Sequence, residues 1–314
     1  HRNGHLQLLG GDKSMRFLAY SRLTRRRLIA GGVAAGAMAT VKGRPGRAAS
    51  VTAFPDLDPV KTYVRLRGST EPDLCFGWLS ARRAAMIEGE VFPMMGVEAA
   101  TVSRYTPRGD GTWDLVVREI TVYTEVETGE LMEELVMPVS GARVRPPALF
   151  LSPEDYIAQP YYEESGRLTL RAESDEELME QMAPQGTYKF DQTIHAPTSD
   201  GESIWARSDY HYRLKPDDPG TRRMFYKEAL TYRADLNEAM NTSKPSLDST
   251  LSYSSSSGFR PWMQMGDIPG HDLTDGMGKK VYRVEDLPER YLAQVEQVYP
   301  GAYDNPEKLL ERVE

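Results

Sequence analysis

The sequence is poor in cysteine, with Cys75 as the single thiol among 314 residues. One thiol excludes an intramolecular disulfide and every metal or cluster motif that needs several cysteines. The stability of the fold must therefore come from a hydrophobic core. Cys75 stands in the apolar stretch DLCFGWL and is predicted to be a small buried member of that core.

The motifs of several common chemistries are also absent. The sequence has no Gly-rich dinucleotide loop, no P-loop, no HExxH and no GxSxG. Asp209 and His211 would share one face of a strand, but Arg207 and Arg213 lie on the same face and their charge opposes a cation. We therefore expect no metal and no cofactor.

Basic residues are scarce after the first fifty positions. Residues 1–50 hold ten Lys or Arg and one Asp, a net charge of +9. Since the whole chain has a net charge of −8, the remaining residues have a net charge of −17. An acidic body disfavours nucleic acid and anionic membrane surfaces as partners, because both attract basic patches.

Long apolar runs are missing as well. The run from Leu28 to Val41 has 14 residues, whereas a membrane-spanning helix needs about 20. It follows Thr24-Arg25-Arg26-Arg27, and together they resemble a twin-arginine export signal. We interpret residues 1–50 as a leader and signal peptide that the twin-arginine machinery reads through Arg25 and Arg26. This predicts a periplasmic or secreted bacterial protein with no stable membrane span after cleavage. An uncleaved single-pass anchor is the alternative.

Alternating apolar and polar residues are abundant in the rest of the chain, residues 51–314, which we expect to form one β-rich domain. The stretch 112–126 is rich in β-branched and aromatic residues and alternates over its whole length. The stretches 186–196, 203–214 and 223–236 alternate in the same way. This pattern is typical of antiparallel strands with one covered face.

Turns and a few helices separate these strands. PRGDG at 107–111 predicts a turn into the strand at 112–126, and ETGE at 127–130 predicts a hairpin with 131–137. Helices are expected at 152–159 and 174–182, from about Leu287-Pro288 onward, and in a short C-terminal segment at 305–314. The Ser-rich stretch 242–258 is expected to be a solvated edge strand with a loop, or a flexible loop.

The predicted fold is mainly β. Many sequential strands and a C-terminal helix favour a single antiparallel up-and-down barrel or strongly curled sheet, similar to calycins and lipocalins. Such a barrel would enclose a cavity for a small apolar ligand. A two-sheet β-sandwich is the alternative.

Two carboxylates fall on otherwise apolar strand faces, Glu119 and Glu228. An unpaired carboxylate on such a face is costly, and in a dry cavity its pKa would rise until it could serve as a general acid or base. Tyr123 shares the face of Glu119 and could hold one ligand oxygen with it. The catalytic candidates are therefore Glu119, Tyr123 and Glu228. In the alternative, these carboxylates pair with arginines such as Arg118 and only organise the sheet.

A second set of residues could bind the ligand. It consists of the polar face of 203–214 and an aromatic corner in PWMQMG: Trp205, Arg207, Asp209, His211, Trp262 and Met263. The corner could form the floor of a ligand cavity or a plug that closes one end of the barrel.

Two blocks of the chain contain Arg118-Glu119, Tyr123-Thr124, Thr128-Gly129-Glu130, Pro261-Trp262-Met263, Met265-Gly266, Gly270, Gly278 and Leu287-Pro288. With these residues the chain resembles the family known as domain of unknown function 1838. The resemblance covers about Asp58 to Pro306, and its more specific part is C-terminal. Where the family tends to carry Trp and then Asn-Pro, this chain reads Leu135-Val136-Met137-Pro138. The resemblance implies fold and export but supplies no catalytic residues.

These observations predict an exported protein that binds or transforms a small apolar oxygenated molecule in a β-cavity. The chemistry would be acid–base, of the lyase or isomerase type. A non-catalytic structural or interaction protein of the cell envelope is the alternative, and the sequence leaves open which of the two it is.

Overall fold

The computed structural model describes residues 57–147, 149–150, 154–158, 167–168, 186–216 and 224–311. All of them belong to one compact unit. In this part of the chain, 12 strands form one antiparallel sheet, so the prediction of a mainly β fold is confirmed. Its long strands are β1 (Cys75–Ile87), β2 (Glu90–Pro107), β3 (Trp113–Thr124), β9 (Gly186–His195), β11 (Ser203–Pro216), β12 (Met224–Asp235), β13 (Thr250–Ser257) and β14 (His271–Val281).

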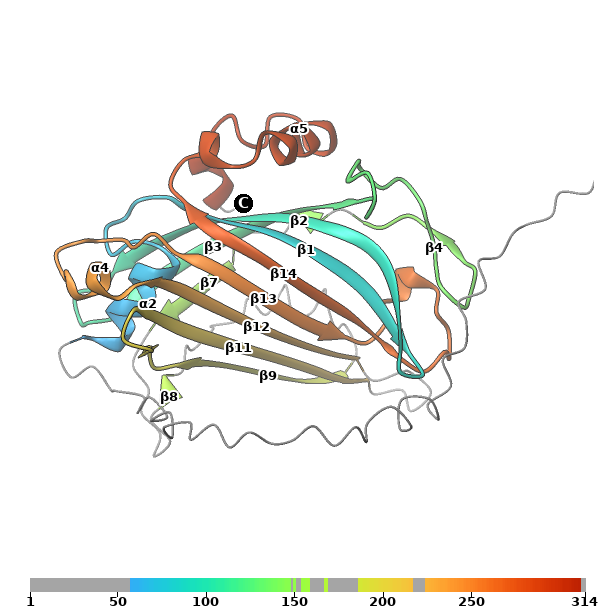
Figure 1. Ribbon diagram of the computed structural model, residues 1–314, viewed down its shortest axis with the longest axis horizontal. Helices are drawn as coiled ribbons and strands as arrows, with labels where there is room; N and C mark the ends of the chain where they lie inside the picture. The colour runs from blue at the N-terminus through green and yellow to red at the C-terminus, as the bar shows by residue number, and fades with distance from the viewer. Residues whose placement is uncertain are drawn as a thin grey trace, which may run out of the picture. The chain divides into compact units, whose positions relative to one another are not determined.

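Two meanders make up the sheet, β1–β2–β3 and β9–β11–β12–β13–β14 (Figure 1). They are joined because β1 pairs with β14, from Phe76 opposite Val281 to Met86 opposite His271. Short strands extend the two edges: β6 (Leu149–Phe150) and β7 (Glu154–Ala158) pair with β3, and β8 (Arg167–Leu168) pairs with β9. Within the described ranges no pairing connects these two edges, so the sheet is a strongly curled half-barrel.

Glycines allow β14 to approach β1 closely in the middle of the sheet. A Cβ atom on Gly278 would lie 1.9 Å from the carbonyl oxygen of Trp78, and one on Gly276 would lie 2.5 Å from Cβ of Ala81. The pairing of β1 with β2 also shifts register between Arg83 and Ala84. Glycines and bulges are the usual means by which a sheet bends.

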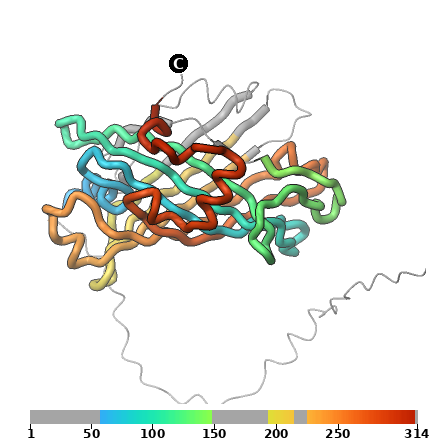
Figure 2. The backbone as a smooth tube through the Cα atoms, turned by 90° about the horizontal axis from the view of Figure 1, so that it is seen from above, coloured from blue at the N-terminus to red at the C-terminus, as the bar shows by residue number. Residues whose placement is uncertain are grey.

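The C-terminal helix covers the convex face of the first meander (Figure 2). Helix α5 (Glu289–Val298) packs through Tyr291 and Val295 on an apolar cluster that includes Phe76 and Ile120. Tyr291 also donates its hydroxyl to the carbonyl of Ile120 at 2.9 Å. The 3₁₀ helices η2 (Val284–Asp286) and η3 (Pro306–Leu310) flank it. Both C-terminal helical predictions are thus confirmed, the second as a 3₁₀ helix.

Helix α2 (Pro59–Arg67) packs on the concave face at one end of the sheet. Asp58 caps it by accepting a hydrogen bond from the backbone N–H of Lys61 at 2.8 Å, and a proline occupies its first position. Its apolar side chains belong to one cluster that joins β3 to β9, β11 and β12, which are distant in the strand order. The sheet therefore curls around this helix, which the sequence analysis did not anticipate. The cluster includes Val60, Tyr63, Val64, Leu115, Val117, Ile194, Ile204 and Tyr232.

A second apolar cluster lies at the other end of the same face. Segment 259–268, with the 3₁₀ helix η1 (Pro261–Met263), packs there against β1, β2 and the end of β3. Its buried members include Met95, Val97, Tyr123, Met137, Phe259, Met263 and Met265. We call the two clusters the α2 cluster and the η1 cluster.

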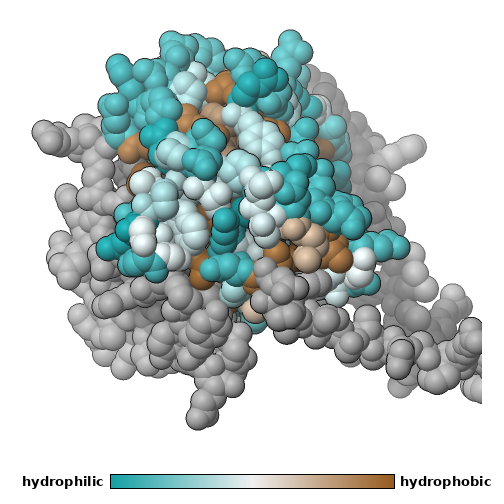
Figure 3. All heavy atoms as spheres, turned by 90° about the vertical axis from the view of Figure 1, so that its left-hand side faces the viewer, coloured by the Kyte–Doolittle hydropathy of each residue, from teal (hydrophilic) through white to brown (hydrophobic). Residues whose placement is uncertain are grey.

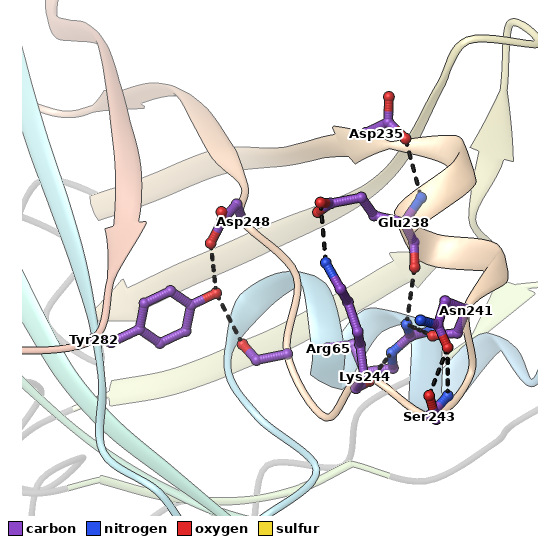
Figure 4. Close-up of polar contacts among 9 residues, drawn as sticks. Arg65, Asp235, Glu238, Asn241, Ser243, Lys244, Asp248 and Tyr282 are labelled. Carbon is purple, nitrogen blue, oxygen red and sulfur yellow. Dashed lines mark hydrogen bonds and ion pairs between the residues drawn. The ribbon is translucent and has the colours of Figure 1, made fainter.

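The side of the molecule that carries α2 and α4 (Leu236–Met240) is mostly hydrophilic, with small apolar patches (Figure 3). Arg65 ties the two helices together, although its side chain is almost fully buried (Figure 4). Its guanidinium donates to the carbonyls of Ala239, Asn241 and Lys244 at 2.6–2.8 Å, and to that of Glu238 at 3.4 Å. Ala239 lies in the last turn of α4, where a helix end leaves carbonyls without intrahelical partners, and Arg65 supplies a donor there.

Two local predictions are wrong. Segment 152–159, expected to be a helix, contains strand β7, which pairs with β3. Segment 131–137 does not return along β3, because only Thr124 and Leu131 form a bridge; β4 (Leu135–Val136) pairs instead with β5 (Arg143–Val144). β7 takes the edge of β3, and β4 pairs with β5 in a separate small sheet; neither pairing is visible in the local sequence.

The Ser-rich stretch was also misjudged. Its second half is β13, an interior strand between β12 and β14 rather than an edge strand or a loop. Ser255 and Ser257 are buried, and Ser257 donates from its backbone N–H and its hydroxyl to Asp272 at 3.0 and 2.7 Å. The helix expected at 174–182 lies outside the described residues.

Candidate functional site

Polar side chains occupy the concave face between the two apolar clusters. On β3, Glu119 and Thr121 follow Val117 of the α2 cluster and precede Tyr123 of the η1 cluster. β13 has the same order: polar residues follow Leu251 of the α2 cluster, and Phe259 of the η1 cluster comes just after the strand ends. Because alternate residues share a face, these side chains form one polar belt. It comprises Arg83, Glu119, Thr121, Tyr226, Glu228, Tyr253, Ser255, Ser257, Asp272 and Thr274.

Glu228 is at the centre of a small hydrogen-bonded group in this belt. Tyr226 donates its phenolic hydroxyl to a carboxylate oxygen of Glu228, and the hydroxyls of Tyr226 and Tyr253 lie 3.0 Å apart. Burial raises the pKa of Glu228 to about 7; the hydrogen bond from Tyr226 opposes this rise, and the negative charge of Glu119 adds to it. A carboxyl group with this pKa can donate or accept a proton at neutral pH.

The two tyrosines are neutral hydrogen-bond donors. Burial raises the pKa of Tyr226 and that of Tyr253 well above the ordinary value of a phenol, and the nearby charge of Glu228 adds to both shifts. They can therefore hold the Glu228 carboxylate or an oxygen atom of a ligand. The alternation of the stretch 223–236 puts Tyr226 on the face of Glu228, but Tyr226 was not among the predicted site residues. Tyr253 was not predicted either, because β13 was not expected inside the sheet.

Glu119 and Tyr123 lie on the concave face, as the alternation predicted, but they have different partners. Glu119 accepts a hydrogen bond from Thr121 Oγ1 at 2.6 Å, whereas the ring of Tyr123 lies 5.5 Å from the guanidinium carbon of Arg83. Arg118, the expected partner in the purely structural alternative, is on the opposite face and donates to the carbonyl of Leu309 at 3.3 Å.

Arg83 is a member of the belt that sequence analysis missed. Its side chain is buried, and its Nε donates to Thr274 Oγ1 at 3.0 Å. The nearest carboxylate oxygen, on Asp272, is 3.9 Å from Nε. The sequence does contain a signal for Arg83. This residue lies between Ala81 and Ala85 on the same strand face, where the neighbouring side chains are small and apolar.

The predicted ligand-binding set on β11 does not join the polar belt. Trp205, Arg207, Asp209 and His211 alternate with the buried Ile204 and Ala206 and therefore lie on the opposite, convex face. Asp209 accepts from Arg207 at 2.7 Å and lies 2.8 Å from His195 Nε2. Partial burial would raise the pKa of Asp209, but the hydrogen bonds from Arg207 and His195 outweigh it and lower this pKa. The single site expected from the sequence is thus divided between two faces.

Trp262 and Met263 lie in the η1 cluster. Met263 is fully buried, and Trp262 packs on the cluster with partial exposure. Both residues therefore pack at one end of the curled sheet.

The convex face also carries an open groove of about 700 Å³. Within it, Glu98 accepts a hydrogen bond from Ser80 at 2.7 Å, and burial raises the pKa of Glu98. The sheet separates this groove from Glu228, so groove and polar belt are distinct surfaces. The lining of the convex groove includes Trp78, Ser80, Gly96, Glu98, Met277 and Lys279.

Among the described residues, no group of three or more His, Cys, Asp or Glu is arranged to hold a metal ion. In the same ranges, no helix has the length and apolar character of a membrane span.

The family model described as "Protein of unknown function (DUF1838)" matches residues 221–314. This match supports an assignment of the C-terminal part of the chain to the DUF1838 family. The match contains the C-terminal block on which the predicted resemblance mainly rested, and it includes Glu228, Tyr253 and Asp272 of the polar belt. The earlier block of that resemblance, from Arg118 to Glu130, lies outside the matched residues and stays a prediction.

Comparison with curated proteins gives no match for this chain. Among solved structures it is similar to a DUF1329 family protein from Desulfovibrio piger, with 12% sequence identity. The alignment covers 75% of this chain and 97% of that one, with a TM-score of 0.16. A likeness this distant carries no argument about site or function.

Proposed function

We propose that this protein binds a small apolar, oxygenated molecule against its polar belt and moves a proton on it through Glu228. The observation that carries the proposal is the Tyr226–Glu228–Tyr253 group, set on the concave face between two apolar clusters. Apolar walls with a few convergent polar groups are the usual make-up of a small-molecule site.

Each catalytic candidate has a role in this proposal. Glu228 accepts or donates the proton, and Tyr226 and Tyr253 orient its carboxylate or hold a ligand oxygen. Glu119 contributes negative charge that favours the protonated form of Glu228. Tyr123 borders the belt at the η1 cluster. The reaction would be an isomerisation or elimination that begins with proton transfer at a carbon next to a carbonyl group.

Proton exchange tests this proposal without knowledge of the natural substrate. The purified protein is incubated in D₂O with a panel of small apolar carbonyl compounds, and loss of the signals of protons next to the carbonyl is followed by NMR. We expect exchange with the wild type and its loss in Glu228→Gln. Glu98→Gln, which changes a half-buried carboxylate of the convex groove, is the matched control and should exchange normally. Loss of exchange in Glu98→Gln alone would move the chemistry to the groove.

A non-catalytic interaction role is the second candidate, and the convex groove favours it. Two large apolar side chains line this groove, Met277 with 70% of its surface exposed and the partly buried Trp78. Native mass spectrometry distinguishes the two candidates. A small molecule that co-purifies with the protein supports the first. A co-purifying protein, together with no proton exchange by the wild type, supports the second.

We further propose that the protein is exported by the twin-arginine route through Arg25 and Arg26. The support comes from the sequence, because residues 1–56 lie outside the described part of the chain. Replacing both arginines with lysine should leave the protein in the cytoplasm, and the periplasmic fraction should contain the wild type only. Export of the double variant at the normal level would contradict this route.

A further inference from the structure

Arg83 and Glu228 belong to one row of residues across four neighbouring strands. Arg83 is opposite Thr274, Thr274 is opposite Ser255, and Ser255 is opposite Glu228. Neighbouring strands are about 4.8 Å apart, so the backbones at the two ends of the row are about 14 Å apart. The two end residues have long side chains and the two between them are small. The row therefore has a cationic end, a hydroxyl-bearing middle and an acid at the other end.

The guanidinium of Arg83 lies beside the ring of Tyr123 and donates one hydrogen bond among the described residues. Its Nε donates to Thr274, and Asp272 lies 3.9 Å from this same atom. Ser257 donates to the other oxygen of Asp272, whereas the oxygen nearest Arg83 accepts no hydrogen bond from the described residues. At 3.9 Å, Asp272 offsets part of the charge of Arg83 but is not a hydrogen-bond acceptor for it. The Nη1 atom of Arg83 is buried and has no acceptor among the described residues. A buried charged donor without an acceptor is costly, so this end of the side chain calls for an acceptor.

We propose that Arg83 binds the carboxylate of the ligand, so that the substrate class of the site is a small organic acid with an apolar body. A guanidinium binds a carboxylate through charge-assisted hydrogen bonds, which a neutral amide or alcohol cannot match. The acid lies along the row with its carboxylate at Arg83 and its reacting carbon toward Glu228. This inference rests on the proposed function, because it takes the polar belt as the binding surface.

The test compares matched pairs of ligands on the purified full-length protein. Aliphatic and aromatic carboxylates of increasing size, each with its primary amide, are titrated by calorimetry. We expect at least one carboxylate to bind at least about tenfold more tightly than its amide, the size of effect that a charge-assisted hydrogen bond gives. Equal binding of both members of every pair, or no binding of any carboxylate, would overturn the inference.

Two variants locate the charge. Arg83→Gln should remove the preference for carboxylate over amide, whereas Arg82→Gln should keep it. Arg82 is the matched control, because it is the next residue on β1, is exposed, and lines the convex groove. Loss of the preference in Arg82→Gln would place the acid in the groove and overturn the inference. Should Arg83→Gln fail to fold, Arg83→Lys keeps the charge but not the planar fork, and a weakened preference in it would support the same conclusion.

Failure of the inference and failure of the proposed function give different results. Carboxylate preference without proton exchange would retain Arg83 as the anion-binding residue and remove the acid–base role of Glu228. Proton exchange with equal binding of acid and amide would retain Glu228 and remove the role of Arg83.

Discussion

Tyr226 and Glu228 lie two residues apart on β12, and the phenolic hydroxyl of Tyr226 donates to the carboxylate of Glu228. This contact forms on a face where burial favours the uncharged acid. The carboxyl group is therefore subject to two opposing effects, burial and hydrogen bonding, and both can be changed by mutation.

The first prediction concerns pH. The pKa of Glu228 is about 7 in the folded protein against an ordinary value of 4.5, so between these values the folded chain holds a proton that the unfolded chain has released. The stability contributed by protonated Glu228 is complete below about pH 4.5 and is lost as the pH rises through about 7. The unfolding free energy of the wild type minus that of Glu228→Gln should fall over this window, by at most about 1.4 kcal/mol per pH unit. Urea titrations measure it, and a difference that rises with pH would contradict it.

Removing the hydroxyl of Tyr226 should raise the pKa of Glu228 further. The hydrogen bond from Tyr226 stabilises the carboxylate, so Tyr226→Phe takes away an effect that lowers this pKa. NMR titration of ¹³C-labelled carboxyl groups would show the shift. Any proton exchange that depends on ionised Glu228 should then need a higher pH, with the thermal midpoint as the control for folding.

Neutralising Glu119 should have the opposite effect. Its negative charge raises the pKa of Glu228, so Glu119→Gln should lower that pKa and leave more carboxylate at neutral pH. The thermal midpoint should change little, because Glu119 contacts Thr121 rather than a buried cation. A large loss of stability would instead show that Glu119 organises the sheet.

The close approach of β14 to β1 predicts a strong effect at Gly278. A Cβ atom there would lie 1.9 Å from the carbonyl oxygen of Trp78, a backbone atom that cannot move without bending β1. Gly278→Ala should destabilise the protein by at least about 2 kcal/mol in chemical denaturation. Gly258→Ala is the matched control, since its nearest contact would be the Phe225 ring at 3.8 Å, and it should change stability by less than about 1 kcal/mol.

Arg65 should be a main stabiliser of the α2 end. Arg65→Met removes a buried donor from four carbonyls around the end of α4, and we expect a loss of about 3 kcal/mol. Arg233→Gln is the control. Its exposed side chain donates to Ser203, and its loss should change stability by less than about 1 kcal/mol. Equal effects of the two changes would show that the carbonyls find water in place of Arg65.

The strand faces could be predicted because alternation is a local property of an extended chain. Glu119, Tyr123 and Glu228 lie on the faces that the pattern assigned to them. Strand β13 could not be predicted in the same way, since its serines look solvated until Asp272 and the flanking strands cover them. The sequence of segment 152–159 predicts a helix, but pairing of residues 154–158 with the edge of β3 overrides this local preference.

The sequence by itself determined that the body of the chain is an antiparallel β structure with a C-terminal helix. It also determined that two acids stand on covered strand faces. Only the tertiary structure decided that these faces belong to one curled sheet, that Arg83 and Glu228 share a row, and that the polar face of β11 is turned away from them. The physical reason is that the two-residue period operates within a strand, whereas register and curl depend on partner strands far away in the chain.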